Sequence, residues 1–418
     1  MGIKSAKLNS EIKQLLNIKF DDLDNLDLLE EDSEGHLFLD PEEITSPQEK
    51  QTFYQCLQDI PKGKEGFEHL QESQKAKAID GKLENCTNGA PDGPPLHDAL
   101  EQIGVKDRTS SYKKGVQDVY DAALSQIEQL FLELIRGNRV KYSRIQEITD
   151  PFTKNFMTDQ AIIQNLSVFY SIEHDYLPNH FLRNFLLAIN IGSSSGYSLP
   201  QVKQMGEAAL LADIGMIMIN GDIRIKKDAL TQEDEWELKK HPIIGLYALE
   251  RLNGIPDEIV FVAYQHHERL TGDGYPKGNQ SRVIHPYAQI VAIADIFDAL
   301  CNERAYRGSY NPSESLKSIL KMAVSGHLDK TYVHNLIKYL SAFPVGSLVL
   351  LNDNRMAKVI QSNAGSPLKP LISVLTDKKE QTLSEKKIFQ IDCSQEEDIY
   401  IERPLNIRAG KNEVMIGF

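Results

Sequence analysis

The sequence predicts a mainly α-helical protein with a small α/β module at the amino terminus and a small β-rich domain at the carboxyl terminus. Three observations support this class: apolar residues recur at helical spacing through the middle of the chain, a cluster of turn residues precedes them, and short apolar segments typical of strands follow them. At roughly 100 to 200 residues per domain, 418 residues suffice for two to four domains. We therefore assign residues 1–61 to an amino-terminal module, 62–111 to a linker, 112–343 to a helical domain and 344–418 to a β-rich domain.

The amino-terminal module is strongly acidic between residues 21 and 50. Within it, the segment HLFL at 36–39 predicts one short strand, which Asp-Pro at 40–41 ends. A solvated surface is the favoured interpretation of the charge, and a surface for a protein partner is the alternative. Residues 62–111 are polar, and NGAPDGPP at 88–95 breaks both helix and strand, so we expect a linker there.

The helical domain begins where apolar residues recur at three- and four-residue steps, from Tyr112 to Gly137. Similar patterns predict further helices at 158–170, 180–191, 199–212, 231–252, 255–268, 286–301, 312–325 and 330–341. After Pro344 the pattern changes to short β-rich segments, LVLL, AKVIQ, PLISVL, IFQID and IYIE, joined by turn residues. A small β domain is therefore expected to close the chain.

Charge and cysteine content argue against several classes of protein. Lys and Arg total 46 and Asp and Glu total 60, so the net charge of −14 argues against a nucleic-acid polymer as partner. The four cysteines form no CxxC pair, which indicates reduced thiols in a cytosolic setting. The start lacks a secretory signal, and no apolar run approaches the roughly 18 to 20 residues that span a bilayer. We expect a cytoplasmic protein with no membrane partner.

Histidine and aspartate are the residue types that indicate chemistry in the helical domain. Imidazole nitrogens and carboxylate oxygens together suit iron, manganese or zinc, and one carboxylate can bridge two ions. A lone histidine is more often a surface or core residue than a ligand. Asp295 in QIVAIADIFDAL and Asp213 in AALLADIG lie in apolar segments, so each must be neutralised, paired or bound to a cation. The candidates, in chain order, are His180, Asp213, His241, His266, His267 and Asp295.

The segment HHERLTGDGYPKG at 266–278 resembles the HHExxDGxGYP motif of the HD-GYP family of cyclic di-GMP phosphodiesterases. The resemblance extends to ADIG at 212–215, LTQEDEWELKKHPIIG at 230–245 and IADIFDALCNERAYR at 293–307, in the order of the family's motifs. It covers roughly residues 112–343 and implies the helical fold of the HD superfamily. The tail that begins FPVGSLVLL resembles the small domain that follows this core in many long family members.

The resemblance implies a role for each candidate. Asp213 is expected to be the catalytic aspartate that bridges two metals, iron or manganese being favoured over zinc, with one or two ions bound. His180 and Asp295 would complete the first metal's ligands, and His241, His266 and His267 those of the second. Gly274 and Tyr275 would shape the substrate entrance, Tyr275 packing on the ligand or on the helical core. Arg304 and Arg307 would bind substrate phosphates or, alternatively, cap a helix end. Asp298 either caps a neighbour or orients one.

The sequence departs from the family's pattern at four positions. Ala212 replaces the histidine of the HD pair, so the first metal would lose an imidazole, and Met216 replaces the lysine that commonly follows. Tyr176 stands where the family has an extra glutamate, which argues against a third metal, with His174 and Asp175 as nearby substitutes. Thr271 replaces the usual acid of the loop after the paired histidines.

We therefore expect a metal-dependent phosphodiesterase acting on cyclic di-GMP, slow because of Ala212 and Met216. The alternative is a catalytically inactive effector that retains one metal and binds cyclic di-GMP without cleaving it. A third hypothesis is an interaction scaffold with a vestigial site. The intact set of Asp213, His241, His266 and His267 argues against the scaffold.

Overall fold

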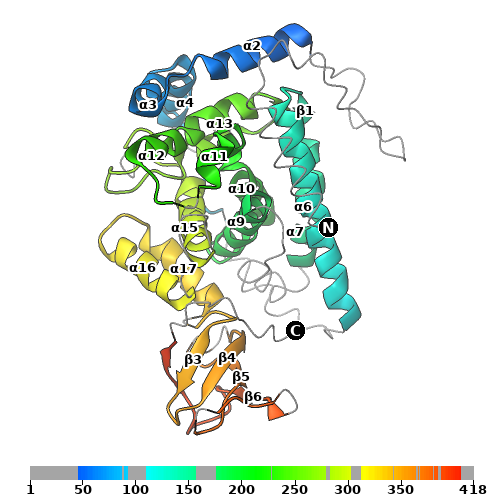
Figure 1. The fold of residues 1–418 in the computed structure, drawn as a ribbon, viewed down its shortest axis with the longest axis vertical. Coiled ribbons are helices and arrows are strands. Elements are labelled where there is room, and N and C mark those ends of the chain that lie inside the picture. The colour runs from blue at the N-terminus through cyan, green and yellow to red at the C-terminus, as the bar shows by residue number, and fades with distance from the viewer. Residues whose placement is uncertain are drawn as a thin grey trace.

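The computed structural model shows a mainly helical protein with a small antiparallel β domain at its carboxyl end, as the sequence predicts (Figure 1). The described residues are 46–86, 89–92, 110–156, 176–226, 228–278, 283–302, 312–341, 343–363, 366, 368–379, 381–384 and 387–405. Several predicted features lie outside them: the strand at 36–39, the helix at 158–170, Arg304, Arg307, His174 and Asp175. No helix within the described ranges is both long and apolar enough to cross a membrane.

Helix α9 (Tyr176–Ser193) is the centre of the helical domain, and every residue from Leu177 to Ser193 is buried. It packs against α6 (Ser110–Ile135), α10 (Leu199–Leu211), α15 (Pro286–Cys301) and α17 (Lys330–Leu340). A helix covered on all sides has no solvent-facing stripe, so polar side chains along it must find partners inside the protein. Helices α7 (Ser143–Phe156), α14 (Asp257–Gln265) and α16 (Pro312–Val324) complete this core, and a short parallel pair joins β1 (Val140–Lys141) to β2 (Leu252–Asn253).

The helix expected at 231–252 is two helices, α12 (Gln232–Lys239) and α13 (His241–Leu249). Thr231 begins α12 with a capping box, in which its side chain accepts from the backbone of Asp234. Pro242 has no backbone N–H to continue the hydrogen bonds of the first helix, so that helix ends and a second begins with proline in its first turn. The break places His241 at the start of a helix.

Residues 63–84, which the sequence analysis assigns to a linker, form two helices instead. After α2 (Pro47–Gln58), helices α3 (Gly63–Gln71) and α4 (Gln74–Glu84) pack beside α12, α13 and α14 (Figure 1). Their buried apolar residues are few, Phe67, Leu70, Ala76 and Leu83, within otherwise polar sequence. A segment with so few apolar residues is typical of a linker, and its helices cannot be predicted without knowing the surface against which these residues pack.

The carboxyl-terminal sheet has the strand order β6-β5-β4-β3-β7, and its neighbours are antiparallel. Its strands are β3 (Leu348–Leu351), β4 (Met356–Gln361), β5 (Leu371–Val374), β6 (Phe389–Asp392) and β7 (Ile401–Pro404), close to the predicted segments. Alternate residues such as Val349, Ala357 and Ile372 are buried in one cluster, because successive side chains of a strand face opposite sides. The domain follows α16 and α17 at one end of the molecule (Figure 1).

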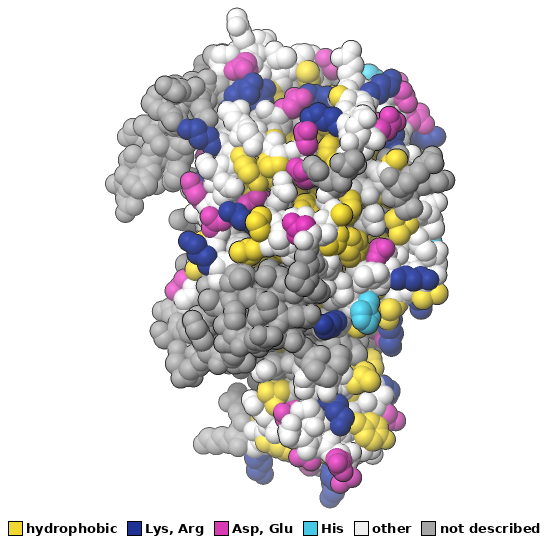
Figure 2. All heavy atoms as spheres, turned by 180° about the vertical axis from the view of Figure 1, so that it is seen from behind, with side chains coloured by type: hydrophobic (Ala, Val, Ile, Leu, Met, Phe, Trp, Pro, Cys, Tyr) yellow, Lys and Arg dark blue, Asp and Glu magenta, His cyan; other side chains and the backbone are white. Residues whose placement is uncertain are grey.

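The surface does not separate the two signs of charge on the face shown in Figure 2, where basic and acidic side chains are interspersed over the described residues. Among the described residues of that face, the acidic side chains are therefore not gathered into one patch.

Candidate metal centre

Five separate elements bring the candidate ligands together. Asp213 precedes the short 3-10 helix η3 (Ile214–Met218), which follows α10, and His266 and His267 follow the end of α14. The other three lie within or at the start of helices: His180 in α9, Asp295 in α15 and His241 at the start of α13. They form two donor groups: Asp213, His241, His266 and His267, and His180, Asp213 and Asp295, with the donor atoms of each group within 4.8 Å of one another.

Gly215 explains how Asp213 reaches His241. A Cβ at Gly215 would lie 2.0 Å from the carbonyl oxygen of His241 and 2.6 Å from the amide nitrogen of Gly245, so no other residue fits this contact between η3 and α13. The close approach brings Oδ1 of Asp213 to 3.2 Å from Nε2 of His241.

The first donor group consists of three imidazoles around one carboxylate. Nδ1 of His241 donates to the carbonyl oxygen of Leu238 at 2.7 Å, and Nδ1 of His266 lies 3.1 Å from the carbonyl oxygen of Ala263. These contacts assign the proton to Nδ1 and leave the lone pair on Nε2. Nε2 of His241 then lies 3.3 Å from Nε2 of His266 and 3.1 Å from Nε2 of His267. Such converging lone pairs fit a bound cation, which would be held by all three nitrogens.

The second donor group is centred on Nε2 of His180. This nitrogen lies 3.0 Å from Oδ2 of Asp213 and 3.3 Å from Oδ1 of Asp295. Its other ring nitrogen, Nδ1, donates to Oδ2 of Asp298 at 2.6 Å, and Asp298 is itself paired with the buried Arg183. Of the two roles considered for Asp298, the geometry supports the orienting one. Asp213 contributes one oxygen to each group and therefore lies between them.

The protonation states suit a metal centre. Burial would raise the pKa of Asp213, but its hydrogen bonds with His180 and His266 and the charges of His266 and His241 hold it well below its usual range, so the carboxylate is ionised. Burial lowers the pKa of His241 to about 4, and burial together with the neighbouring His266 and His241 lowers that of His267. Burial also opposes protonation of His180, yet the negative groups around it, with Tyr176, raise its pKa overall. A cation would supply the positive charge that these acids attract.

Tyr275, in the loop after the paired histidines, stacks on the ring of His267, with centroids 4.5 Å apart and planes inclined by 19°. The loop returns to this position because Gly274 lies so close to the backbone of residues 267–269 that a Cβ there would be 2.5 Å from the carbonyl oxygen of His267. Gly274 thus shapes the loop through backbone contacts. Tyr275 packs on a candidate metal ligand rather than on the apolar core.

The positively charged side chain of Lys239 lies beside this loop. Nζ of Lys239 is 5.9 Å from the centre of the Tyr275 ring and 4.7 Å from that of Trp236. Neither Lys239 nor Trp236 was among the residues predicted to form the site. The sequence does contain a signal for Lys239, in the segment ELKK immediately before His241. A lysine two residues before a metal ligand can reach the same site.

The amino-terminal helices support both sides of the centre. Nζ of Lys277, two residues after Tyr275, donates to the carbonyl oxygen of Gln71 on α3 at 3.0 Å, and the side chain of Gln71 donates to the carbonyl oxygen of Pro276. On the other side, Nζ of Lys240 donates to the carbonyl oxygen of Pro61 at 2.6 Å. Helix α3 therefore links the loop of Tyr275 to the segment that carries His241.

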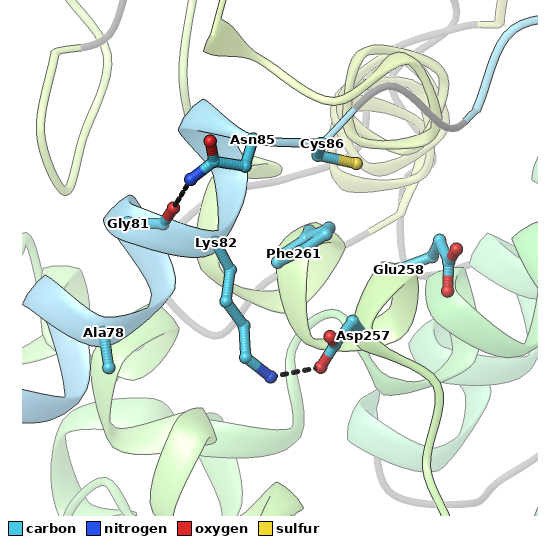
Figure 3. Close-up of a pocket in the computed structure, with 8 residues that line it drawn as sticks. All are labelled: Ala78, Gly81, Lys82, Asn85, Cys86, Asp257, Glu258 and Phe261. Carbon is cyan, nitrogen blue, oxygen red and sulfur yellow. Dashed lines mark hydrogen bonds and ion pairs between the residues drawn. The ribbon is translucent and has the colours of Figure 1, made fainter.

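A hollow of about 620 Å³ lies elsewhere, between α4 and α14, and none of the candidate ligands lines it (Figure 3). The ion pair between Lys82 and Asp257, 2.6 Å long, crosses it. Its position separates it from the centre formed by the histidines and aspartates.

The comparisons with known proteins agree with this geometry. Residues 178–332 match the family model for an HD domain, and residues 348–413 match a KOW domain associated with the HD domain. The chain is 31% identical over 209 residues to the cyclic di-GMP phosphodiesterase PdeB of Borreliella burgdorferi, an alignment that covers 49% of this chain and 55% of PdeB. It is 24% identical over 297 residues to the cyclic di-GMP phosphodiesterase PA4108 of Pseudomonas aeruginosa, which covers 71% of this chain and 67% of the relative.

Among solved structures, Bd1817, an HDG"Y"P protein from Bdellovibrio bacteriovorus, aligns with a TM-score of 0.45 at 17% identity, over 57% of this chain and 76% of that one. The chain spans little more than half of PdeB. The fold and the donor groups define a helical HD domain with a candidate metal centre. Within that class, the motifs at 212–215 and 266–278 resemble those of the HD-GYP family, and both relatives named above carry the name cyclic di-GMP phosphodiesterase.

Proposed function

We propose that this protein is a metal-dependent phosphodiesterase that hydrolyses cyclic di-GMP. The observation that carries the proposal is the position of Asp213, whose two carboxylate oxygens belong to two different buried donor groups. A shared carboxylate between two sets of imidazole and carboxylate donors is the arrangement that two-metal hydrolases use. Both named relatives described above are cyclic di-GMP phosphodiesterases, which supports this substrate.

The residues of the candidate site would have separate roles in binding the metals and the substrate. His241, His266 and His267 with Asp213 would hold one cation, and His180, Asp213 and Asp295 would hold the other. When bound, iron or manganese would activate water as a nucleophile and neutralise charge on the phosphodiester. Burial of the donors limits competing water, which strengthens their electrostatic interactions. Tyr275 and Lys239 lie beside the donors. The ring of Tyr275 would contact a base of the dinucleotide, and the ammonium group of Lys239 would contact a phosphate.

We propose that turnover is slow. Met216 packs against the apolar core, so it supplies no charge where the family commonly has a lysine. Ala212 is fully buried and supplies no donor atom. Fewer groups would therefore stabilise the charge that develops on the phosphate. Arg304 and Arg307 stay as predicted phosphate ligands.

The second candidate function is an effector that binds cyclic di-GMP without cleaving it, and the substitutions Ala212 and Met216 are the observations in its favour. Anaerobically purified protein, analysed for metal and then incubated with cyclic di-GMP, separates the two. Slow, metal-dependent formation of a linear or fully hydrolysed product supports the enzyme. Tight binding with intact ligand after prolonged incubation of metal-replete protein supports the effector, and no binding at all would contradict both.

A further inference from the structure

Asn184 lies beside the donor group of His180, Asp213 and Asp295. It is one helical turn after His180 in α9, so the two side chains lie on the same face of the helix. Its side chain is almost completely buried, with 1% of its surface exposed. Nδ2 of Asn184 lies 3.3 Å from Nε2 of His180, the nitrogen that also contacts Asp213 and Asp295.

The other half of the amide is unsatisfied. Oδ1 of Asn184 is buried and has no hydrogen-bond partner among the described residues. A buried amide oxygen without a partner is costly, because its interaction with water has been lost and nothing replaces it. The oxygen and nitrogen of an asparagine amide are nearly equal in size, so a half-turn of the amide exchanges their positions. That half-turn brings the oxygen to the side of His180, among the donors.

We propose that Asn184 is a metal ligand, and that its Oδ1 takes the place in the His180 group that Ala212 leaves without a donor. This inference rests on the proposed two-metal centre. The group then offers one imidazole nitrogen, one amide oxygen and two carboxylate oxygens, from His180, Asn184, Asp213 and Asp295.

This donor set also predicts which ion each group prefers. Oxygen donors that are neutral or anionic favour hard cations such as manganese or magnesium, whereas a set of three imidazoles suits iron or zinc. The His180 group is therefore expected to bind manganese more tightly, whereas the group of His241, His266 and His267 also accepts manganese but is expected to bind iron or zinc more tightly.

The test is manganese titration of metal-stripped protein, with bound ions counted by elemental analysis and followed by electron paramagnetic resonance. Wild type is expected to bind two manganese ions per chain. Asn184→Leu keeps the volume but removes both polar atoms, and we expect it to weaken one of the two sites roughly 10- to 100-fold or more, given that even the partners of metal ligands matter by that factor. Asn184→Asp keeps an oxygen donor and should retain both ions.

Two further results bear on the proposal. Ala212→His combined with Asn184→Leu should restore the second ion, because it returns an imidazole donor beside Asp213. Equal manganese binding by wild type and a folded Asn184→Leu would overturn the proposal, as would a wild type that binds one ion only. If Asn184→Leu does not fold, loss of an ion in Asn184→Asp would overturn it. These readouts are independent of turnover: two ions without hydrolysis of cyclic di-GMP would contradict the proposed function and leave Asn184 as a ligand.

Discussion

The Oδ2 atom of Asp298 accepts a hydrogen bond from Nδ1 of His180 over 2.6 Å, and this contact decides which imidazole nitrogen faces the candidate metal centre. Asp298 also neutralises Arg183, which is buried on the same face of α9. A carboxylate that holds the far nitrogen of a histidine raises the basicity of the near one and fixes the orientation of the ring. The centre therefore depends on a residue that would contact no metal.

Asp298→Asn should weaken metal binding at the His180 group by roughly 10- to 100-fold, because the amide cannot hold the His180 proton as a carboxylate does. The metal-free variant should also unfold at a lower temperature, since Arg183 loses its buried counter-ion. Manganese titration and thermal unfolding measure the two effects. Asn302→Ala is the matched control: it removes a 2.9 Å hydrogen bond that a neutral amide donates to the same carboxylate, and it should leave metal binding nearly unchanged. Similar losses in both variants would contradict an orienting role.

Replacing His266 and His267 together by alanine should remove the ion held with His241 and Asp213 without unfolding the helical domain. Both residues follow the end of α14, and the main core is formed by the apolar residues of the surrounding helices. Elemental analysis and far-ultraviolet circular dichroism check the result. Global loss of helical signal would instead assign the two histidines to the core.

Stability should decrease in acid because of His285, which caps α15. Its Nδ1 accepts from the backbone nitrogen of Tyr287 at 3.2 Å, and burial lowers its pKa to about 4. Between pH 6.5 and 4 the unfolded chain binds a proton at this residue and the folded chain does not. The free energy of unfolding therefore decreases as the pH is lowered from 6.5 to 4. The full effect is about 3 kcal/mol from a shift of that size.

Denaturant unfolding of metal-stripped wild type and His285→Asn at a series of pH values measures this contribution. Asparagine keeps a cap acceptor but does not titrate, and the candidate metal ligands titrate equally in both proteins. The difference between the two should therefore change across the window and level off above pH 6.5. A difference that is constant from pH 4 to 7 would show that the pKa of His285 is the same in the folded and the unfolded chain, and would contradict this prediction.

Lys239→Met should weaken binding of cyclic di-GMP roughly tenfold or more by removing a charge-assisted contact to phosphate. Trp236 is the single tryptophan of the chain and lies 4.7 Å from Nζ of Lys239, so its fluorescence reports on this position. Stopped-flow mixing reads binding before slow turnover. Lys64→Met is the control, because Lys64 lies 5.8 Å from the same ring but is paired with Glu68. Unchanged affinity in Lys239→Met would remove Lys239 from the binding surface.

The sequence was sufficient to predict the elements that depend on local pattern. The strands of the β domain follow from short β-rich segments joined by turn residues, and the donor residues follow from acids in apolar helices and from the paired histidines. Helices α3 and α4 were assigned to a linker because their few apolar residues are meaningful only against the surface of α12 and α13. The break at Pro242 was also missed, although proline in a helical pattern is a local signal.

The contacts that sequence reasoning missed in the centre are long-range or orientational. Gln71 meets Pro276 across more than 200 positions of sequence, and nothing in either segment indicates the other. Arg183 and Asn184 were visible as polar residues in HFLRNFLLAIN. Their importance becomes apparent only when α9 is buried on every side, because their polar groups then need partners within the centre.

The most direct test of the central claim is a turnover assay of cyclic di-GMP with wild type and Asp213→Asn, both loaded with manganese under anaerobic conditions and analysed by chromatography. Asparagine keeps the size of the residue but removes the charge that the two donor groups share. The account predicts slow hydrolysis by wild type, its loss on chelation, and its absence in Asp213→Asn together with reduced metal content. Equal hydrolysis by the two proteins, or hydrolysis by wild type that persists after the metal is removed, would contradict it.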